Sequence, residues 1–167
     1  IFEVGENRIF YSLNALKGVG EAAADHIATA RGDRVFSTLE DFCERTEPKI
    51  VNRRVLESLI NAGAMDCFGH DRAAMMAGVD RVLGFSQRVQ TQSESGQADI
   101  FGSGALGAAE AIVMPKTSPW PVAERLTREH QAAGFYLSAH PLDEYKSVLD
   151  KMRIQNWADF SLAVKKG

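Results

Sequence analysis

Two glycines flank a valine near the N-terminus, at Gly18, Val19 and Gly20, with Lys17 directly before them. Glycine adopts positive φ without strain and lets another molecule approach the backbone closely. The tripeptide therefore predicts a tight turn whose amide groups face outward. Outward amides at the start of a helix, beside a lysine charge, suit a phosphate oxygen. Residues 17–20 are the first candidate binding site.

The residues around this turn have the spacing of two packed helices. Leu13 and Leu16 precede the turn, and Ala24 and Ile27 follow it. Ala24 is small enough for close helix packing, and Ile27 lies one helical turn later on the same face. This is the spacing of a helix-hairpin-helix motif. A tight turn between two helices that binds no ligand is the alternative interpretation.

Composition places this chain of 167 residues among soluble globular proteins, as one good-sized domain or two small ones, with 45% hydrophobic and 25% charged residues. The net charge of −3 argues against a strongly basic nucleic-acid binder and against a membrane-surface protein. No apolar run approaches the roughly 18 residues of a membrane span, and no signal peptide is evident. Because the chain begins with Ile1 rather than Met, we expect a fragment of a longer protein.

The sequence predicts no metal site and no cofactor. Cys43 and Cys67 are not part of a Cys-x-x-Cys pair, so neither structural zinc nor an iron–sulfur cluster is expected. Their count allows a disulfide, but their apolar helical surroundings predict two buried, reduced thiols. The histidines lack the spacing of metal ligands; they are His26, His70, His130 and His140.

Helix-start signals divide the first 90 residues into a mainly α fold that follows two short extended pieces in residues 1–11. Ser37 and Glu40 form a capping box, with serine as the N-cap. Asn52 caps a helix that ends at Gly63 and has an apolar stripe at Val55, Leu56, Leu59 and Ile60. Asp71 caps one long helix over residues 72–90, whose core-facing side we expect to comprise Ala73, Met76, Val79, Leu83 and Ser86.

The remaining chain changes character twice. Residues 91–119 are rich in Gln, Ser, Gly, Ala, Thr and Pro, which predicts a flexible linker. Residues 120–167 predict a C-terminal helical segment that leads to a following domain. Within it, Gly134 breaks one helix and Pro141 begins another over residues 142–152.

Inside the linker, Ile100 and Phe101 are adjacent, large and apolar, and polar residues flank them. Exposed apolar side chains in a solvated linker favour docking on a partner, and Gln97 could bond at the rim of the partner's pocket. Burying both apolar side chains gives roughly 3–6 kcal/mol gross, which predicts a weak contact that needs multivalency. Folding back onto the chain's own core is the alternative.

Three segments together resemble the alpha subunit of bacterial DNA polymerase III: residues 16–20, 51–57 and 134–143. The resemblance implies a helix-hairpin-helix DNA-binding domain over residues 1–90 that holds duplex DNA behind the polymerase active site. It implies DNA-backbone contacts from Lys17, Gly18, Val19 and Gly20, to which the local basic cluster Lys49, Arg53 and Arg54 would add. It also implies that the linker segment binds the beta sliding clamp through Gln97, Asp99, Ile100 and Phe101.

The same resemblance implies other polymerase III holoenzyme subunits as partners and a bacterial, nucleoid-associated location in the cytoplasm, without a membrane. Ile100 stands where Met or Leu is more usual in the family's clamp motif, and Ala139 stands where Gly is common. An error-prone polymerase of the same family would share much of this pattern.

The chain itself is expected to be non-catalytic, although its parent would be a DNA-directed DNA polymerase, a nucleotidyltransferase. Nucleotidyl transfer needs two metals held by close carboxylates, and the chain contains no Asp-x-Asp. The alternative function is a helix-hairpin-helix module of a DNA-repair enzyme, such as a base-excision glycosylase. Asp41 lies at the distance beyond the hairpin that a glycosylase's catalytic aspartate would need.

Overall fold

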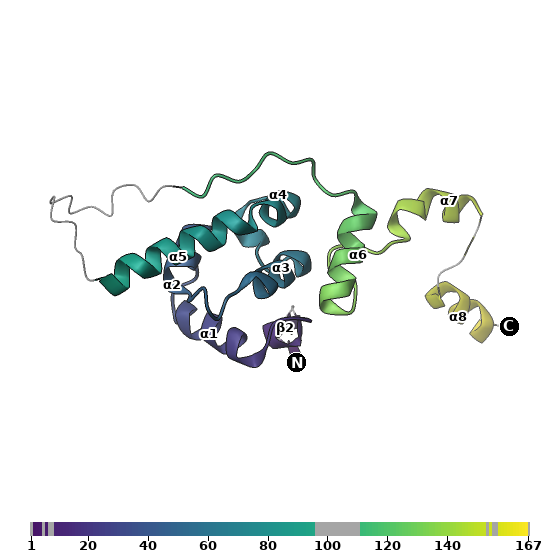
Figure 1. Cartoon of the computed structure of the whole chain (residues 1–167). Coiled ribbons are helices and arrows are strands. Elements are labelled where there is room, and N and C mark those ends of the chain that lie inside the picture. The colour runs from purple at the N-terminus through teal and green to yellow at the C-terminus, as the bar shows by residue number, and fades with distance from the viewer. Residues whose placement is uncertain are drawn as a thin grey trace.

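The computed structural model describes residues 2–4, 6, 9–95, 111–152, 154 and 157–166, and the fold is mainly α as predicted. Strands β1 and β2 form one antiparallel pair in which Phe2 lies opposite Tyr11. After β2, every element that the structure describes is a helix (Figure 1). The elements are β1 (Phe2–Val4), β2 (Ile9–Tyr11), the 3-10 helix η1 (Leu13–Ala15), α1 (Glu21–Arg31), α2 (Leu39–Arg45), α3 (Arg53–Ala62), the 3-10 helix η2 (Asp66–Phe68), α4 (Arg72–Ala77), α5 (Val79–Ser95), α6 (Val122–Ala133), the 3-10 helix η3 (Asp143–Tyr145), α7 (Lys146–Lys151) and α8 (Trp157–Lys166).

One hydrophobic core joins α1 through α6. Helix α2 packs against α5, and α3 packs against α6, which brings a late segment of the chain beside an early one (Figure 1). The predicted stripe of α3 is buried throughout, and Gly63 ends that helix in the left-handed conformation. Apolar burial along these faces is the main favourable contribution to folding. Residues 120–133 therefore belong to the same packed body as the hairpin.

Helix caps confirm two predicted starts and correct a third. Asn52 accepts a hydrogen bond from an α3 amide, and Asp71 accepts from two α4 amides, as expected. The N-cap of α2 is Thr38 rather than Ser37, because the threonine hydroxyl reaches the Asp41 amide. The predicted register was one residue too early.

The long helix predicted over residues 72–90 is two helices, α4 and α5, which meet at Gly78. A Cβ on Gly78 would lie 2.8 Å from Met114 Sδ and 3.0 Å from Pro115 Cδ. A distant segment therefore packs directly on this junction. The core-facing side also differs from the prediction, because Met75 is fully buried and Met76 is only half-buried.

The expected linker differs from the prediction at both ends. Helix α5 continues through Ser95, and residues 111–120, named the strap, cross the helical core in an extended conformation (Figure 1). The buried Ile112 donates its N–H to Glu40 Oε1 at 2.7 Å, and Arg81 donates to the Val113 carbonyl at 2.5 Å. The predicted clamp-binding segment, residues 97–101, lies outside the described residues, and the three-part domain division stays a prediction.

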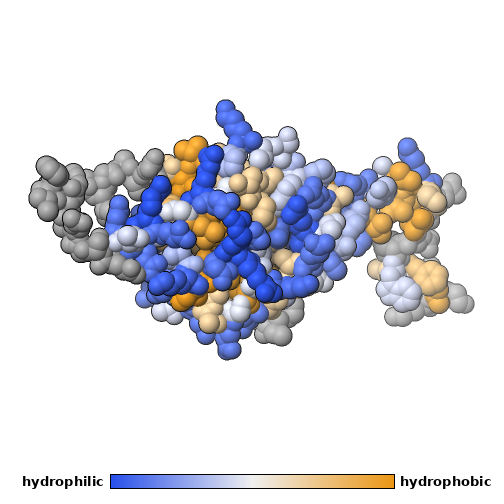
Figure 2. Space-filling view, viewed as in Figure 1, coloured by the Kyte–Doolittle hydropathy of each residue, from blue (hydrophilic) through white to orange (hydrophobic). Residues whose placement is uncertain are grey.

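The C-terminal part also departs from expectation. Residues 142–152 form η3 and α7 instead of one helix, and α8 follows. Large apolar side chains are exposed over α7 and α8, at the right-hand end of Figure 2. None of the helices that the structure describes is both long and apolar enough to span a bilayer.

The two thiols differ from each other. Cys43 is buried, and burial raises the pKa of its thiol to about 11. Cys67 is exposed, which corrects the prediction that both are core residues. Neither forms a disulfide.

A buried carboxylate in α6 binds the chain segment that follows this helix. Glu129 is fully buried and accepts hydrogen bonds from the amides of Leu137 and Ser138 and from the Ser138 hydroxyl. Arg72 adds an ion pair at 3.4 Å. These bonds hold the chain after Gly134 against α6.

Candidate nucleic-acid interface

The two hairpin glycines have different structural roles. Gly18 has φ +99°, and a Cβ there would lie 2.5 Å from Ser58 Oγ. Gly20 has φ −79°, and its Cβ position has no heavy atom within 4 Å. Val19 between them is buried in the core. Gly18 is thus required by the backbone and its neighbour, whereas Gly20 faces open space.

Helices α3 and α6 both form hydrogen bonds with the turn. The Lys17 N–H donates to the Ala132 carbonyl of α6 at 2.8 Å. The Lys17 carbonyl accepts from the Ser58 hydroxyl of α3 at 2.8 Å. Tyr11 donates its hydroxyl to the carbonyls of Ala15 and Ala133. Sequence reasoning missed these supports. Ser58 and Ala132 lie 41 or more residues from the turn, so no local signal could reveal them. Tyr11 is close to the turn, but its bond to Ala133 joins residues 122 positions apart.

The N-terminus of α1 is not closed by a side chain. Its N-cap is Gly20, which has no side chain to accept a hydrogen bond, whereas side chains cap α2, α3 and α4. Within the part of the chain that the structure describes, the amides of Gly20, Glu21 and Ala22 donate to no protein acceptor. Such amides and the positive end of the helix dipole attract anions, although the exposed Glu21 adds one negative charge.

The second glycine-containing turn, between α3 and α4, is built differently. Gly63 and Gly69 both have positive φ, as in a hairpin. At the start of α4, however, the Asp71 carboxylate accepts from the amides of Ala73 and Ala74 at 2.8 and 3.4 Å. The chain's own carboxylate therefore fills the position that a phosphate would take, and the first hairpin remains the better candidate.

The structure separates the predicted basic residues. Lys17 is exposed on the turn, and Arg54 Nε lies 3.4 Å from the Cβ position of residue 18. Arg53 instead forms ion pairs with Glu57 and Asp80. The exposed Lys49 precedes α3. Arg54 thus lies beside Gly18 and Lys17 is exposed on the same turn, while Arg53 is paired with carboxylates; the DNA-binding roles of all these residues stay predictions.

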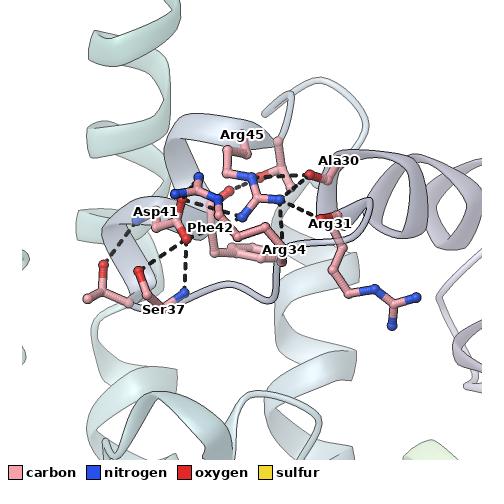
Figure 3. Close-up of polar contacts among 9 residues, drawn as sticks. Ala30, Arg31, Arg34, Ser37, Asp41, Phe42 and Arg45 are labelled. Atoms are coloured by element: carbon pink, nitrogen blue, oxygen red, sulfur yellow. Dashed lines mark hydrogen bonds and ion pairs between the residues drawn. The ribbon is translucent and has the colours of Figure 1, made fainter.

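Asp41, the candidate catalytic aspartate of the glycosylase alternative, belongs to a cluster of hydrogen bonds and ion pairs that joins α1 to α2 (Figure 3). Its carboxylate accepts from the Ser37 amide at 2.9 Å and from Arg34 at 2.9 Å. The Ser37 hydrogen bond first, and Arg34 with it, hold the pKa of Asp41 below its ordinary value. Arg45 bonds the same carboxylate and the Ala30 carbonyl at the end of α1. These contacts account for Asp41 as a structural residue.

Two other kinds of site, a pocket and a metal site, have less support than the hairpin. A pocket of about 260 Å³ lies between the end of α2 and α5, lined by Cys43, Glu44, Arg45, Thr46, Glu47, Ser86, Val89, Gln90 and Ser93. It contains none of the predicted site residues. Among the described residues, no group of three His, Cys, Asp or Glu side chains is placed to hold a metal ion.

Comparison with known proteins agrees with this geometry. Residues 1–75 match the family model described as "Helix-hairpin-helix motif". The chain is 42% identical over 154 residues to DNA polymerase III subunit alpha of Vibrio cholerae, which covers 90% of this chain and 13% of that protein. The same subunit of Escherichia coli is 38% identical over 149 residues (87% of this chain, 13% of that protein), and that of Caulobacter vibrioides is 35% identical over 153 residues (91% and 13%). The chain thus spans about one eighth of the length of these relatives.

Proposed function

From its homology to one segment of the bacterial DNA polymerase III alpha subunits, we propose that this chain binds duplex DNA through its hairpin and a sliding clamp through residues 97–101. It would thereby support processive synthesis by a longer protein. The homology also supports a parent that is a DNA-directed DNA polymerase of the bacterial cytoplasm, with other holoenzyme subunits as partners. The segment itself would have no nucleotidyltransferase activity.

The observation that carries the DNA-binding proposal is the open N-terminus of α1 at Gly20, with the exposed Lys17 on the turn and Arg54 beside Gly18. Amides and two cations in this arrangement contact phosphate oxygens and not base edges, so binding would be independent of DNA sequence. The net charge of −3 limits the electrostatic attraction. We expect weak affinity with a shallow salt dependence, from about one to three phosphate contacts.

Gly20→Leu tests this site without disturbing the fold, because the Cβ position of Gly20 is open and its φ suits any residue. A leucine there would prevent close approach of a phosphate, so duplex affinity should fall about tenfold, the value of one charge-assisted hydrogen bond. The measurement is fluorescence anisotropy with two duplexes of unrelated sequence.

Gly84→Leu is the matched control, since a Cβ on Gly84 in α5 also meets nothing within 4 Å. It should bind DNA as the unmodified chain does. If Gly20→Leu binds with unchanged affinity while its circular dichroism spectrum is preserved, the hairpin is not the phosphate site.

The clamp proposal rests on Gln97, Asp99, Ile100 and Phe101, the residues that match the family's motif. It is supported by the anchoring of the flanking chain, because α5 ends at Ser95 and the strap is docked from Ile112 onward. Residues 97–101 would then present Ile100 and Phe101 to the clamp from a stably folded domain.

Replacing Ile100 and Phe101 together by alanine should abolish capture of the chain by immobilised sliding clamp. Leu106→Ala is the control, because it removes another apolar side chain from the same stretch of the sequence. Clamp capture that survives the double substitution would refute this part of the proposal, and equal loss with Leu106→Ala would show that the motif is assigned to the wrong residues.

A further inference from the structure

Ser58 differs from three other hydroxyl residues that lie in a helix or at its end. The hydroxyls of Thr46, Thr91 and Thr127 each donate to a carbonyl four residues earlier, which is the common bond for such residues. Ser58, in the middle of α3, instead donates to the carbonyl of Lys17, 41 positions away, at 2.8 Å. Its hydroxyl therefore joins α3 to the hairpin turn.

This bond determines which way the next amide points. The peptide between Lys17 and Gly18 is trans, so its carbonyl and its N–H point in opposite directions. Because the carbonyl points at Ser58, the Gly18 N–H points away from α3. Among the residues that the structure describes, no protein acceptor receives that N–H.

The neighbouring peptide is held as well. The Lys17 N–H donates to the Ala132 carbonyl, which orients the peptide between Leu16 and Lys17. These two peptides flank Lys17, so the bonds constrain the backbone of Lys17. The next residue, Gly18, has positive φ, and Ser58 Oγ occupies the space where its Cβ would be. The turn is thus set by α3 on one side and by α6 on the other.

We propose that Ser58 is a positioning residue of the phosphate site, whose hydroxyl orients the Lys17–Gly18 peptide so that the Gly18 N–H faces a phosphate oxygen of duplex DNA. This inference rests on the proposed DNA binding, and it assigns a role to a residue that the hairpin motif itself does not include.

Ser58→Ala is the first test, with Thr91→Ala as a control that also removes a helix hydroxyl bonded to a carbonyl. Duplex affinity of Ser58→Ala should fall about three- to tenfold at every salt concentration. The salt slope should stay unchanged, because an amide releases no counterion, whereas Lys17→Met should reduce it by about one. In ¹⁵N-labelled chain, titration with inorganic phosphate should shift the Gly18 amide resonance, and Ser58→Ala should suppress that shift.

A second pair of variants keeps the test decisive if alanine disturbs the fold. Ser58→Thr and Ser58→Val have nearly the same shape and differ in the hydroxyl. The threonine variant should bind better than the valine variant, and equal duplex affinities with equal phosphate shifts would overturn the role of Ser58. A failure of the proposed function is a different result, because then the unmodified chain would bind no duplex and phosphate would move no hairpin amide.

Discussion

The same substitution, glycine to alanine, should have different consequences at Gly18 and at Gly20, although the two positions are only two residues apart. Gly18 has φ +99°, where alanine is strained, and the added Cβ would lie 2.5 Å from Ser58 Oγ. Gly20 has φ −79° and ψ 164°, an extended conformation open to every residue, and its Cβ would meet nothing within 4 Å.

The magnitudes follow from these geometries. At Gly18, left-handed alanine costs roughly 1–2 kcal/mol, and displacement of the Ser58 hydroxyl loses a hydrogen bond worth about 1 kcal/mol. The expected loss of unfolding free energy is about 2–3 kcal/mol. At Gly20, the reduced entropy of the unfolded chain stabilises by about 0.4–1 kcal/mol. Alanine is a poorer N-cap than glycine by a similar amount, roughly 0.5–1 kcal/mol, so the net change is close to zero.

Urea unfolding followed by far-ultraviolet circular dichroism measures the difference. If the denaturant slopes of the two variants agree, the shift in midpoint reports stability alone. The midpoint for Gly18→Ala should be lower by about 1–1.5 M, for a slope of roughly 2 kcal/mol per M. Equal midpoints for the two variants would refute the conclusion that the two glycines have different roles.

Three further predictions concern other parts of the molecule. Glu129→Ala should lower the unfolding free energy by about 3–5 kcal/mol, because it leaves buried donors unpaired; a urea midpoint near that of the unmodified chain would contradict this. A thiol reagent near neutral pH should label the exposed Cys67 in the folded chain and the buried Cys43 only on unfolding, which mass spectrometry of the labelled peptides would show. The Ser37 amide holds the pKa of Asp41 low, so the stabilisation by Asp41 is complete at neutral pH and is lost as the pH falls through the lowered pKa. Asp41→Asn should therefore lose less stability on acidification, and a parallel loss in both chains would count against this contact.

Most local features of the fold could be predicted from the sequence. The spacing of Gly18 and Gly20 predicted the turn, Asn52 and Asp71 predicted two helix starts, and the periodicity of α3 predicted its buried face. These signals involve residues within about four positions of one another, where backbone geometry and capping bonds act directly. The location of the candidate site could be predicted for the same reason.

Other features of the fold were decided only by the tertiary structure, because they depend on contacts between residues far apart in the sequence. The α4–α5 junction at Gly78 is covered by the strap, and Ile112 is held by Glu40, 72 positions away. Arg53 and Arg54 are both basic, yet they project about 100° apart around α3, so that Arg54 lies beside Gly18 and Arg53 pairs with Asp80 of α5. Composition predicted a linker through residue 119, yet residues 112–115 pack on the helices, since polar and small residues give no sign of a partner surface far along the sequence.

The hairpin itself shows both kinds of information. Its glycines and its lysine are local, and the sequence determined that a turn would form there. The directions of the Lys17 and Gly18 amides are set by Ala132 and Ser58, which meet the turn only when α3 and α6 pack together. A trans peptide bonded on its carbonyl side must present its N–H on the other, so packing determines the side on which the Gly18 amide lies.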